Sequence, residues 1–248
     1  MRATTTTILA CLAFSPGFAQ TLPAAGGASL NLPVGESLVY DVRFGIFNVG
    51  TARMDVLGVE NVRGRAAWHT KLEIGGSVVG FKVHDVLESW IDVETGNSLR
   101  FSQESAEGSK QRSRRYEIDP VRGTYQRDGH PAQATVAQPL DEGAFLYFVR
   151  RQPLELGQTV SFPRYFIPER NPVTVSAVRR ERVTVPAGTF DTIVLKPVIR
   201  SAGVFSENGR AEIWLSNDES RRMVQLVTHV TFGTLSLRLR EARTQSSQ

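Results

Sequence analysis

The sequence is poor in cysteine and histidine, and this scarcity excludes several kinds of site. Cys11 is the only cysteine, and it lies in a segment that we expect to be removed on export. The mature chain would then have no disulfide and no thiolate ligand or nucleophile. The four histidines lack the spacing of zinc motifs, so we predict no metal site and no cofactor; they are His69, His84, His130 and His229.

Long apolar runs and a serine hydrolase motif are also missing. No stretch after the N-terminal segment approaches the ~18 apolar residues of a spanning helix, so we predict no transmembrane segment in the mature chain. A Gly-x-Ser-x-Gly motif in a strand–turn–helix context is absent. Aromatic residues form only 8% of the chain, which argues against the aromatic girdles of an outer-membrane barrel.

The N-terminus is typical of an export signal. Met1-Arg2 gives a charged start, residues 8–14 form an apolar run, and Gly17-Phe18-Ala19 resembles a cleavage site. We therefore predict a signal peptide over residues 1–19 and a periplasmic location. A lesser alternative is a lipoprotein acylated at Cys11, because the preceding Ile-Leu-Ala loosely resembles a lipobox.

Beyond the signal, composition predicts one β-rich domain. Residues 20–31 are rich in alanine, glycine and proline and are expected to form a flexible leader. The domain is expected over residues 32–242, and a polar, disordered tail over 243–248.

Positive charge is modest and comes almost entirely from arginine. The formal net charge is +4, and arginine supplies 25 of the 29 cationic residues. An excess of arginine outside the cytoplasm suits anionic lipid head groups or polysaccharide, although solvated strand faces explain the same charge without a partner. The export signal argues against nucleic acid as the partner.

Alternation of apolar and polar residues is the main structural signal. Leu38, Tyr40, Val42 and Phe44 occupy every second position, which predicts a strand with one buried face. Residues 209–232 repeat this pattern around a polar turn and predict a β-hairpin. About a dozen such segments, spaced roughly 8–12 residues apart, predict an all-β antiparallel fold, either a strongly curved barrel-like sheet or a β-sandwich.

One segment near the middle of the chain predicts a short helix instead. Asp141 is suited to cap its start, and Phe145, Phe148 and Val149 fall on one helical stripe. We expect this helix to pack over the sheet, or to plug an open end of it.

Five segments in order carry a resemblance to a known family. They are residues 40–52, 140–150, 185–191, 213–218 and 232–235. Together the chain from about Leu32 to Arg240 resembles the exported bacterial family called domain of unknown function 3108. The resemblance implies an envelope location and a β-rich fold, and it implies no activity or catalytic residue.

One strand is unusually rich in groups that could do chemistry. His84, Glu88 and Asp92 alternate onto one face, whereas Asp85 faces the other side with apolar neighbours. The four side chains therefore do not converge on one ion or substrate. We expect a solvated polar face, with Asp85 as a buried polar residue paired with an inward-pointing arginine.

These observations favour a non-enzymatic protein of the periplasm or cell envelope. We expect its curved sheet to hold a lipid-like or polymeric envelope component in an apolar cavity. The candidate lining residues are Trp68, Phe81, Trp90, Phe145, Phe148 and Trp214, although ordinary core packing explains each of them equally. The alternatives are a module that docks on an envelope protein through sheet edges and Arg-rich strands, and a hydrolase that acts through carboxylates.

Overall fold

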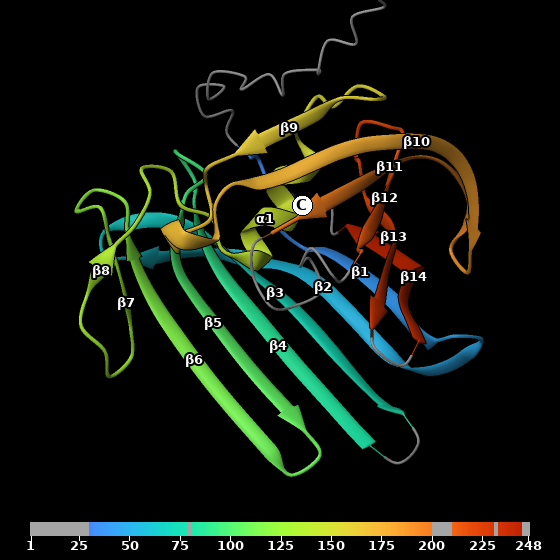
Figure 1. Cartoon of the computed structure of the whole chain (residues 1–248), viewed down its shortest axis with the longest axis horizontal. Helices are drawn as coiled ribbons and strands as arrows, with labels where there is room; N and C mark the ends of the chain where they lie inside the picture. Colours follow the sequence, from blue (N-terminus) through green and yellow to red (C-terminus); the bar gives the residue numbers. More distant parts are fainter. Residues whose placement is uncertain (1–29, 79–80, 200–209, 231–232, 245–248) are drawn as a thin grey trace, which may run out of the picture.

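The computed structural model describes residues 30–78, 81–199, 210–230 and 233–244. The expected signal peptide, Cys11 and most of the expected leader lie outside these residues. Within them the chain forms one 14-stranded antiparallel sheet and one α-helix (Figure 1). The prediction of an all-β antiparallel fold is confirmed, and of its two forms the curved, barrel-like sheet is the one observed.

Among the described residues, fourteen strands and two helical segments follow one another. The first half contains β1 (Glu36–Phe44), β2 (Phe47–Val62), β3 (Arg65–Val78), β4 (Phe81–Asp92), β5 (Ser98–Glu107), β6 (Lys110–Asp119), β7 (Thr124–Arg127) and β8 (Gln133–Ala134). The second half contains α1 (Glu142–Arg150), β9 (Thr159–Phe162), the 3-10 helix η1 (Pro168–Arg170), β10 (Val173–Val185), β11 (Gly188–Val198), β12 (Glu212–Ser216), β13 (Met223–Val230) and β14 (Gly233–Thr244).

The two halves of the chain join through the first and the last strand of the sequence. Consecutive strands pair from β1 to β8 and again from β9 to β14, and β1 pairs with β14 in the middle of the sheet. The sheet is not closed, because β8 and β9 form its two edges and do not pair with each other. The loop before α1 and the loop after β9 meet between these edges, where Leu140 and Tyr165 form a parallel bridge.

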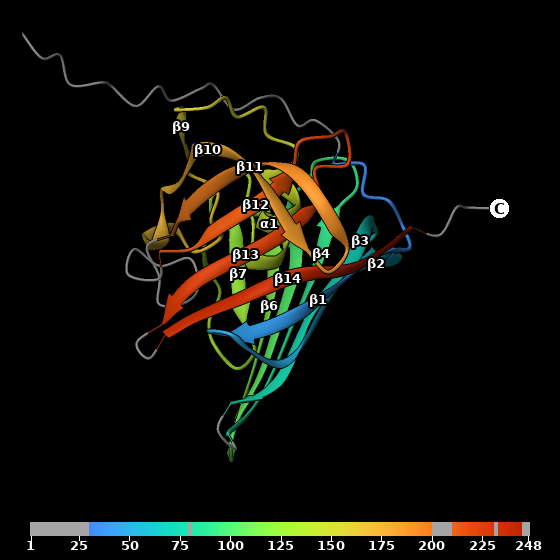
Figure 2. The ribbon, with the colours of Figure 1, turned by 90° about the vertical axis from the view of Figure 1, so that its right-hand side faces the viewer.

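The sheet curves around α1, and the main core lies between them (Figure 2). Alternation places Leu38 and Tyr40 on the inner face, where each is 0% exposed. As predicted, the Asp141 side chain caps α1 by accepting a hydrogen bond from the backbone N–H of Ala144. Residues 143–150 of α1 are all buried, so the helix is part of the core itself. Gly143 packs so closely on Ser89 of β4 that a larger side chain would collide with the serine hydroxyl.

The domain extends slightly beyond its predicted boundaries. Leu30 belongs to the expected leader, but its side chain is buried in the core. At the other end, β14 continues to Thr244, two residues into the segment expected as a tail. Hydrophobic burial of Leu30 and strand pairing of Thr244 with Glu36 order these terminal residues.

The far ends of β3, β4, β5 and β6 project beyond α1, as Figures 1 and 2 show. Toward the outer end of this projection β2 and β3 approach each other closely at Gly50 and Gly76, which pair in register. A Cβ atom on Gly76 would lie 2.6 Å from the carbonyl oxygen of Val49. Small residues are therefore required at this contact, as the glycine in this part of the sequence predicts.

Candidate functional site

The projecting part of the sheet presents an inner face that α1 does not cover. Thr70, Ser89, Phe101 and Tyr116 form a buried cross-strand row beside α1. Positions two and four residues further along each strand lie on the same face. We call this surface the inner strip, and it consists of Leu72, Ile74, Asp85, Leu87, Gln103, Ser105, Arg112 and Arg114.

The inner strip changes in chemistry from one strand to the next. Leu72, Ile74 and Leu87 make its β3 and β4 side apolar, whereas Arg112 and Arg114 make its β6 side cationic. Both arginines are exposed, and within the described residues neither forms an ion pair. An apolar surface next to free guanidinium groups is suited to an amphiphilic anion.

The outer face of the same strands differs, because its charges neutralise one another. Glu73 of β3 contacts both Lys71, at 2.8 Å, and His84 of β4, at 2.9 Å. On the neighbouring strands Arg100 contacts Glu117 at 2.6 Å. The outer face is thus the solvated polar face expected from the sequence at His84 and Glu88. Asp92, expected on the same face, is instead only 1% exposed, because it pairs with Arg65 and its Oδ1 atom accepts hydrogen bonds from the backbone of the turn after β4.

Asp85 lies on the inner strip, on the opposite face of β4 from His84, as the alternation predicts. It is half-buried, and its Oδ1 atom is buried without a hydrogen-bond partner. The expected arginine partner is not in contact: Arg112 stands in the same cross-strand row, but Ser105 of β5 lies between them. Asp85 therefore offers an acceptor that no described side chain occupies.

A pair of carboxyl groups lies at the root of the inner strip, where α1 begins. The Oδ1 atom of Asp141 accepts hydrogen bonds from the Ser89 hydroxyl at 2.6 Å and from the Ala144 N–H at 2.9 Å. Burial raises the pKa of Asp141 to about 6, although these hydrogen bonds act in the opposite direction. Its Oδ2 atom is buried without a partner among the described residues.

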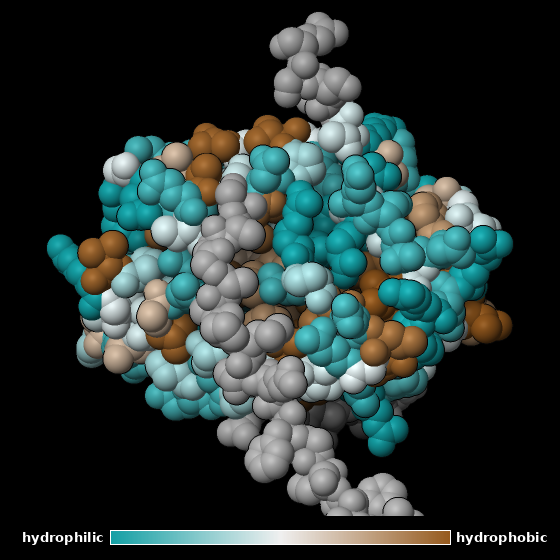
Figure 3. All heavy atoms as spheres, turned by 90° about the horizontal axis from the view of Figure 1, so that it is seen from above, coloured by the Kyte–Doolittle hydropathy of each residue, from teal (hydrophilic) through white to brown (hydrophobic). Residues whose placement is uncertain are grey.

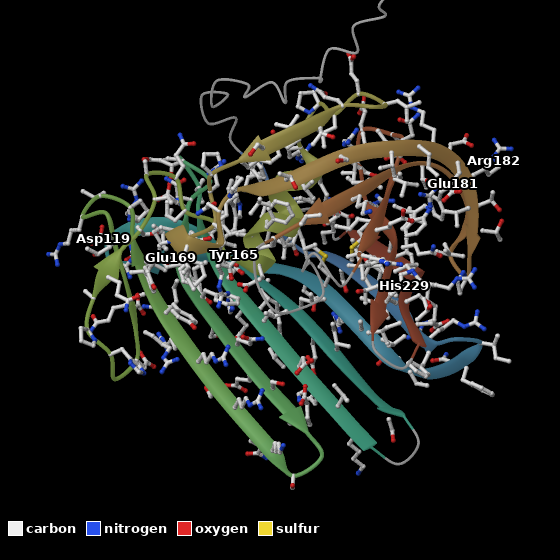
Figure 4. The ribbon with its side chains drawn as sticks, in the orientation of Figure 1. Asp119, Tyr165, Glu169, Glu181, Arg182 and His229 are labelled. Atoms are coloured by element: carbon white, nitrogen blue, oxygen red, sulfur yellow. The ribbon has the colours of Figure 1, made fainter. Side chains whose placement is uncertain are left out.

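Glu142 is the second of these carboxyl groups, and it belongs to a polar cluster with Tyr165 and Arg170. Its Oε1 atom accepts a hydrogen bond from the Tyr165 hydroxyl, which in turn accepts one from Arg170 at 2.8 Å. Burial raises the pKa of Glu142, while the positive charges of Arg170 and Arg114 lower it. Figure 4 shows Tyr165 beside α1, near the centre of the molecule.

This arrangement provides acceptors and charges for binding more readily than groups for catalysis. Asp141 is 0% exposed, so a substrate does not reach it in this conformation. Glu142 is held by Tyr165 and is only partly exposed. In the part of the chain that the structure describes, no three His, Cys, Asp or Glu side chains gather into a metal site.

The six residues predicted to line a cavity do not share one surface. Trp68, Phe145 and Phe148 lie in the main core. Trp90 belongs to a smaller cluster on the outer face and stacks on His69. Trp214 lies beneath Arg179 and donates a hydrogen bond to Glu181. Phe81 begins β4, but its side chain is outside the described residues.

Two recesses of the surface lie away from the inner strip, and charged and apolar residues together line both of them. One, of about 410 Å³, lies on the outer face between β1, β2, β3 and β14 and includes Arg53 and Arg240. The other, of about 600 Å³, includes Arg63 and Arg122. On the side of the molecule seen from above, polar and apolar residues are interspersed (Figure 3).

Sequence reasoning missed most of the polar groups at the root of the strip. It identified Asp141 as a helix cap but assigned no role to Ser89, Glu142, Tyr165 or Arg170. The adjacent acids Asp141 and Glu142 before an apolar helix were a usable signal. Tyr165 and Arg170 follow β9 and meet α1 at Glu142, beside the bridge between Leu140 and Tyr165, and no local pattern reveals these contacts.

Comparisons with known proteins agree with this fold and add no activity. A β-barrel-like protein of domain of unknown function DUF1849 from Brucella abortus superimposes with a TM-score of 0.57 at 8% identity, over 86% of this chain and 98% of that one. A predicted lipoprotein from Parabacteroides distasonis gives a TM-score of only 0.32 at 12% identity, over 85% of this chain and 95% of that one. At such identities the first likeness concerns the fold alone, and the second is too weak to support an argument.

No curated protein sequence matches the chain. Among the described residues, α1 is too short to cross a bilayer. The family model described as "Protein of unknown function (DUF3108)" matches residues 39–240, which include the strands from β2 to β13 and α1. The chain therefore belongs to the DUF3108 family, as the segments quoted from its sequence predict.

Proposed function

We propose that this protein is an exported, non-enzymatic binding protein of the cell envelope that holds an anionic, lipid-like ligand on the inner strip. The observation that carries the proposal is the apolar surface of β3 and β4 beside the free arginines of β6. A hydrocarbon chain would lie against Ile74 and Leu87. Its anionic group would meet Arg112 and Arg114.

The ligand would lie along an open face rather than in a closed cavity. Leu72 is 9% exposed and the next residues outward are half-buried, so the strip leads from the core to solvent. The unpartnered Oδ1 atom of Asp85 would accept a hydrogen bond from a hydroxyl or amide group of the ligand. The proposed location in the cell envelope rests on the predicted export signal, either as a cleaved signal peptide or, alternatively, as a lipoprotein signal acylated at Cys11.

Binding of cis-parinaric acid, a fluorescent fatty acid, tests the proposal. We expect the acid to bind more tightly than its methyl ester, because only the acid carries a charge for the arginines. The double variant Arg112→Glu/Arg114→Glu should weaken binding of the acid about tenfold, which corresponds to about 1.4 kcal/mol, and should leave the ester unchanged.

The matched control reverses two arginines outside the strip. Arg115 and Arg122 are exposed, and Arg115→Glu/Arg122→Glu makes the same change in net charge. If this control lowers affinity as much as the strip variant does, general electrostatics explain the binding. Failure of the wild-type protein to bind either probe would refute the proposal.

A second candidate function, docking on an envelope protein, is favoured by the open edge of β6. Only Tyr116–Asp119 of this strand pairs with β7, so within the described part of the chain Lys110–Arg114 has a neighbouring strand on one side alone. The carbonyl of Arg115 accepts from Asp128 on the β7 side, and the backbone of Ser113, two residues earlier, therefore faces the same way. An extended peptide could add here as a further strand.

Cross-linking in envelope extracts tests this second function. Ser113→Pro removes an outward N–H at a position where an edge strand tolerates proline, and Ser113→Ala is the control. A cross-linked partner that is lost with proline but kept with alanine is the expected result. Equal cross-linking by both variants would count against edge pairing.

A further inference from the structure

The turn between β1 and β2 exposes two large apolar side chains at its tip. Ile46 is 76% exposed and Phe47 is 69% exposed. Adjacent in sequence, they stand at the end of a hairpin that projects from the sheet (Figure 1). Solvent exposure of an isoleucine and a phenylalanine together is unfavourable for a free protein, so these residues call for an explanation.

The geometry of the turn does not provide that explanation. Phe44 pairs with Phe47, which leaves Gly45 and Ile46 as the turn residues. Gly45 has a φ of 57°, a left-handed conformation that favours glycine at this position. The second turn position carries no such demand for isoleucine, and polar residues usually occupy turns of this kind.

The tip is nevertheless held firmly in place. The N–H of Gly45 donates to the carbonyl of Thr234 on β14 at 2.9 Å. The guanidinium of Arg43 donates to the carbonyl of Ile46 at 2.6 Å. Thr234 and Arg43 thus fix the turn that presents the two apolar side chains. A fixed conformation of this kind is expected of a binding surface.

The character of the tip favours a bilayer over a protein as its partner. Ile46 and Phe47 form a small convex projection, whereas a stable protein interface needs a much broader complementary surface. The antiparallel order of strands places the first residues of β4 and β6 at the same end of the sheet, and Lys82 and Lys110 are exposed there. An apolar tip accompanied by cationic residues is suited to an anionic lipid surface.

The turns at the other end of the sheet have a different composition. Arg63-Gly64, between β2 and β3, and Asn217–Ser220, between β12 and β13, carry no exposed large apolar side chain. Exposed large apolar residues at that end stand singly, as Val34, Val121 and Leu156 do. The paired apolar residues therefore mark one end of the molecule.

We propose that the β1–β2 tip docks this protein on an anionic membrane, with Ile46 and Phe47 inserted among the lipid head groups. This inference goes beyond the proposed ligand-binding function, because it rests on residues outside the inner strip. The strip opens toward the same end of the sheet, so a docked protein would present it near the lipids.

Co-sedimentation with vesicles tests the inference. The processed protein, from which residues 1–19 have been removed, is mixed with vesicles of equal parts phosphatidylglycerol and phosphatidylcholine. Ile46→Asp should lower the affinity at least about tenfold, since it removes an apolar side chain that the lipid would bury and adds a negative charge. Val121→Asp is the matched control, because it makes the same kind of change at an exposed site on the other end.

A fluorescent variant provides a second readout. Phe47→Trp should retain binding, because tryptophan favours the membrane interface, and its emission should shift to shorter wavelength when vesicles are added. The inference is wrong if the wild-type protein does not sediment with the vesicles, if Ile46→Asp and Val121→Asp behave alike, or if the tryptophan emission does not shift. Loss of fatty-acid binding with retained vesicle binding would instead refute only the proposed function.

Discussion

At the scale of single residues, Asp141 combines two opposing effects. Its carboxylate stabilises α1 as an N-cap and holds Ser89, which together contribute about 1–2 kcal/mol in comparable caps. Its complete burial makes the charged form costly, and its pKa is raised from 3.8 to about 6. The hydrogen bonds thus offset only part of the desolvation cost.

The raised pKa predicts that stability falls as pH rises through about 6. Between the unfolded pKa of 3.8 and the folded value of about 6, the native state binds more protons than the unfolded state. The stabilisation by the neutral carboxyl is complete below the lower value and is lost above the upper one. A shift of this size corresponds to about 2–3 kcal/mol.

Urea denaturation at a series of pH values measures this effect. Asp141→Asn keeps an acceptor for Ala144 but cannot ionise, so its free energy of unfolding should lack this fall. Asp141→Ala also lacks the fall, but it loses the cap and should be less stable than the wild type at low pH. Parallel pH profiles for the wild type and Asp141→Asn would show that Asp141 does not titrate in this range.

At the scale of elements, α1 is fixed at both ends to parts of the sheet distant in sequence. Asp141 connects its start to β4, and Arg150 connects its end to β1. The Arg150 guanidinium makes two hydrogen bonds to the Glu36 carboxylate, at 2.7 and 2.9 Å. It also donates to the carbonyls of Ser220 and Arg221 in the turn between β12 and β13.

Removing either member of this ion pair should be strongly destabilising. The side chains of Arg150 and Glu36 are only 6% and 3% exposed, so Arg150→Ala leaves an uncompensated buried charge. We expect Arg150→Ala and Glu36→Gln each to lower the free energy of unfolding by about 3–5 kcal/mol.

Chemical denaturation with an exposed ion pair as control measures this loss. Arg182 and Asp191 pair on the surface at 2.8 Å, where solvent screens the interaction. Arg182→Ala should therefore leave the unfolding midpoint unchanged. Should the Arg150 and Arg182 variants unfold at the same midpoint, the buried pair would not anchor the helix.

The elements could be predicted from the sequence because their signals are local. Alternation defined β1 and the hairpin of β12 and β13, and Asp141 with the apolar stripe defined α1. The same alternation grouped Trp214 with Arg210 and Glu212, away from Ile213 and Leu215, and so indicated the outer face. Its size and apolarity nevertheless suggested a cavity residue, whereas Arg179 covers its ring in the structure.

Contacts between distant segments could not be predicted in this way. Glu36 and Arg150 are 114 positions apart, and nothing local to either residue names the other. The inner strip could not be predicted for the same reason. Alternation shows that Ile74 and Arg112 face inward, but whether they share one surface depends on the register of four strands. The outer-face position of Trp90 likewise follows from its pairing opposite His69.

At the scale of the whole molecule, the pairing of β1 with β14 holds the two halves of the chain in one sheet. Glu36 pairs with Thr244, so the first and last strands lie side by side. The other connection is α1 with the loops at Leu140 and Tyr165. This architecture requires that β1 and β14 lie side by side. It does not require that they be the first and last strands of the sequence.

A circular permutant tests this requirement. A glycine–serine linker of about ten residues, with a reach of about 17 Å, would join Thr244 to Leu30. New termini would be placed between Gly108 and Ser109, two exposed residues of the turn between β5 and β6. We expect the permutant to retain the far-ultraviolet circular dichroism and the single cooperative unfolding of the parent, because every strand keeps its neighbours.

Deletion of β14 should have the opposite result. A chain that ends before Gly233 would leave β1 and β13 as long unpaired edges and would expose Leu38 and Tyr40 of the core. Such edges promote aggregation, so we expect loss of cooperative unfolding and of soluble monomer in size-exclusion chromatography. If the deletion variant stays monomeric and cooperative while the permutant does not, chain order rather than the β1–β14 pair determines the fold. If instead the permutant folds cooperatively and the deletion variant does not, the pairing of β1 with β14 is what joins the two β-rich halves into a single domain.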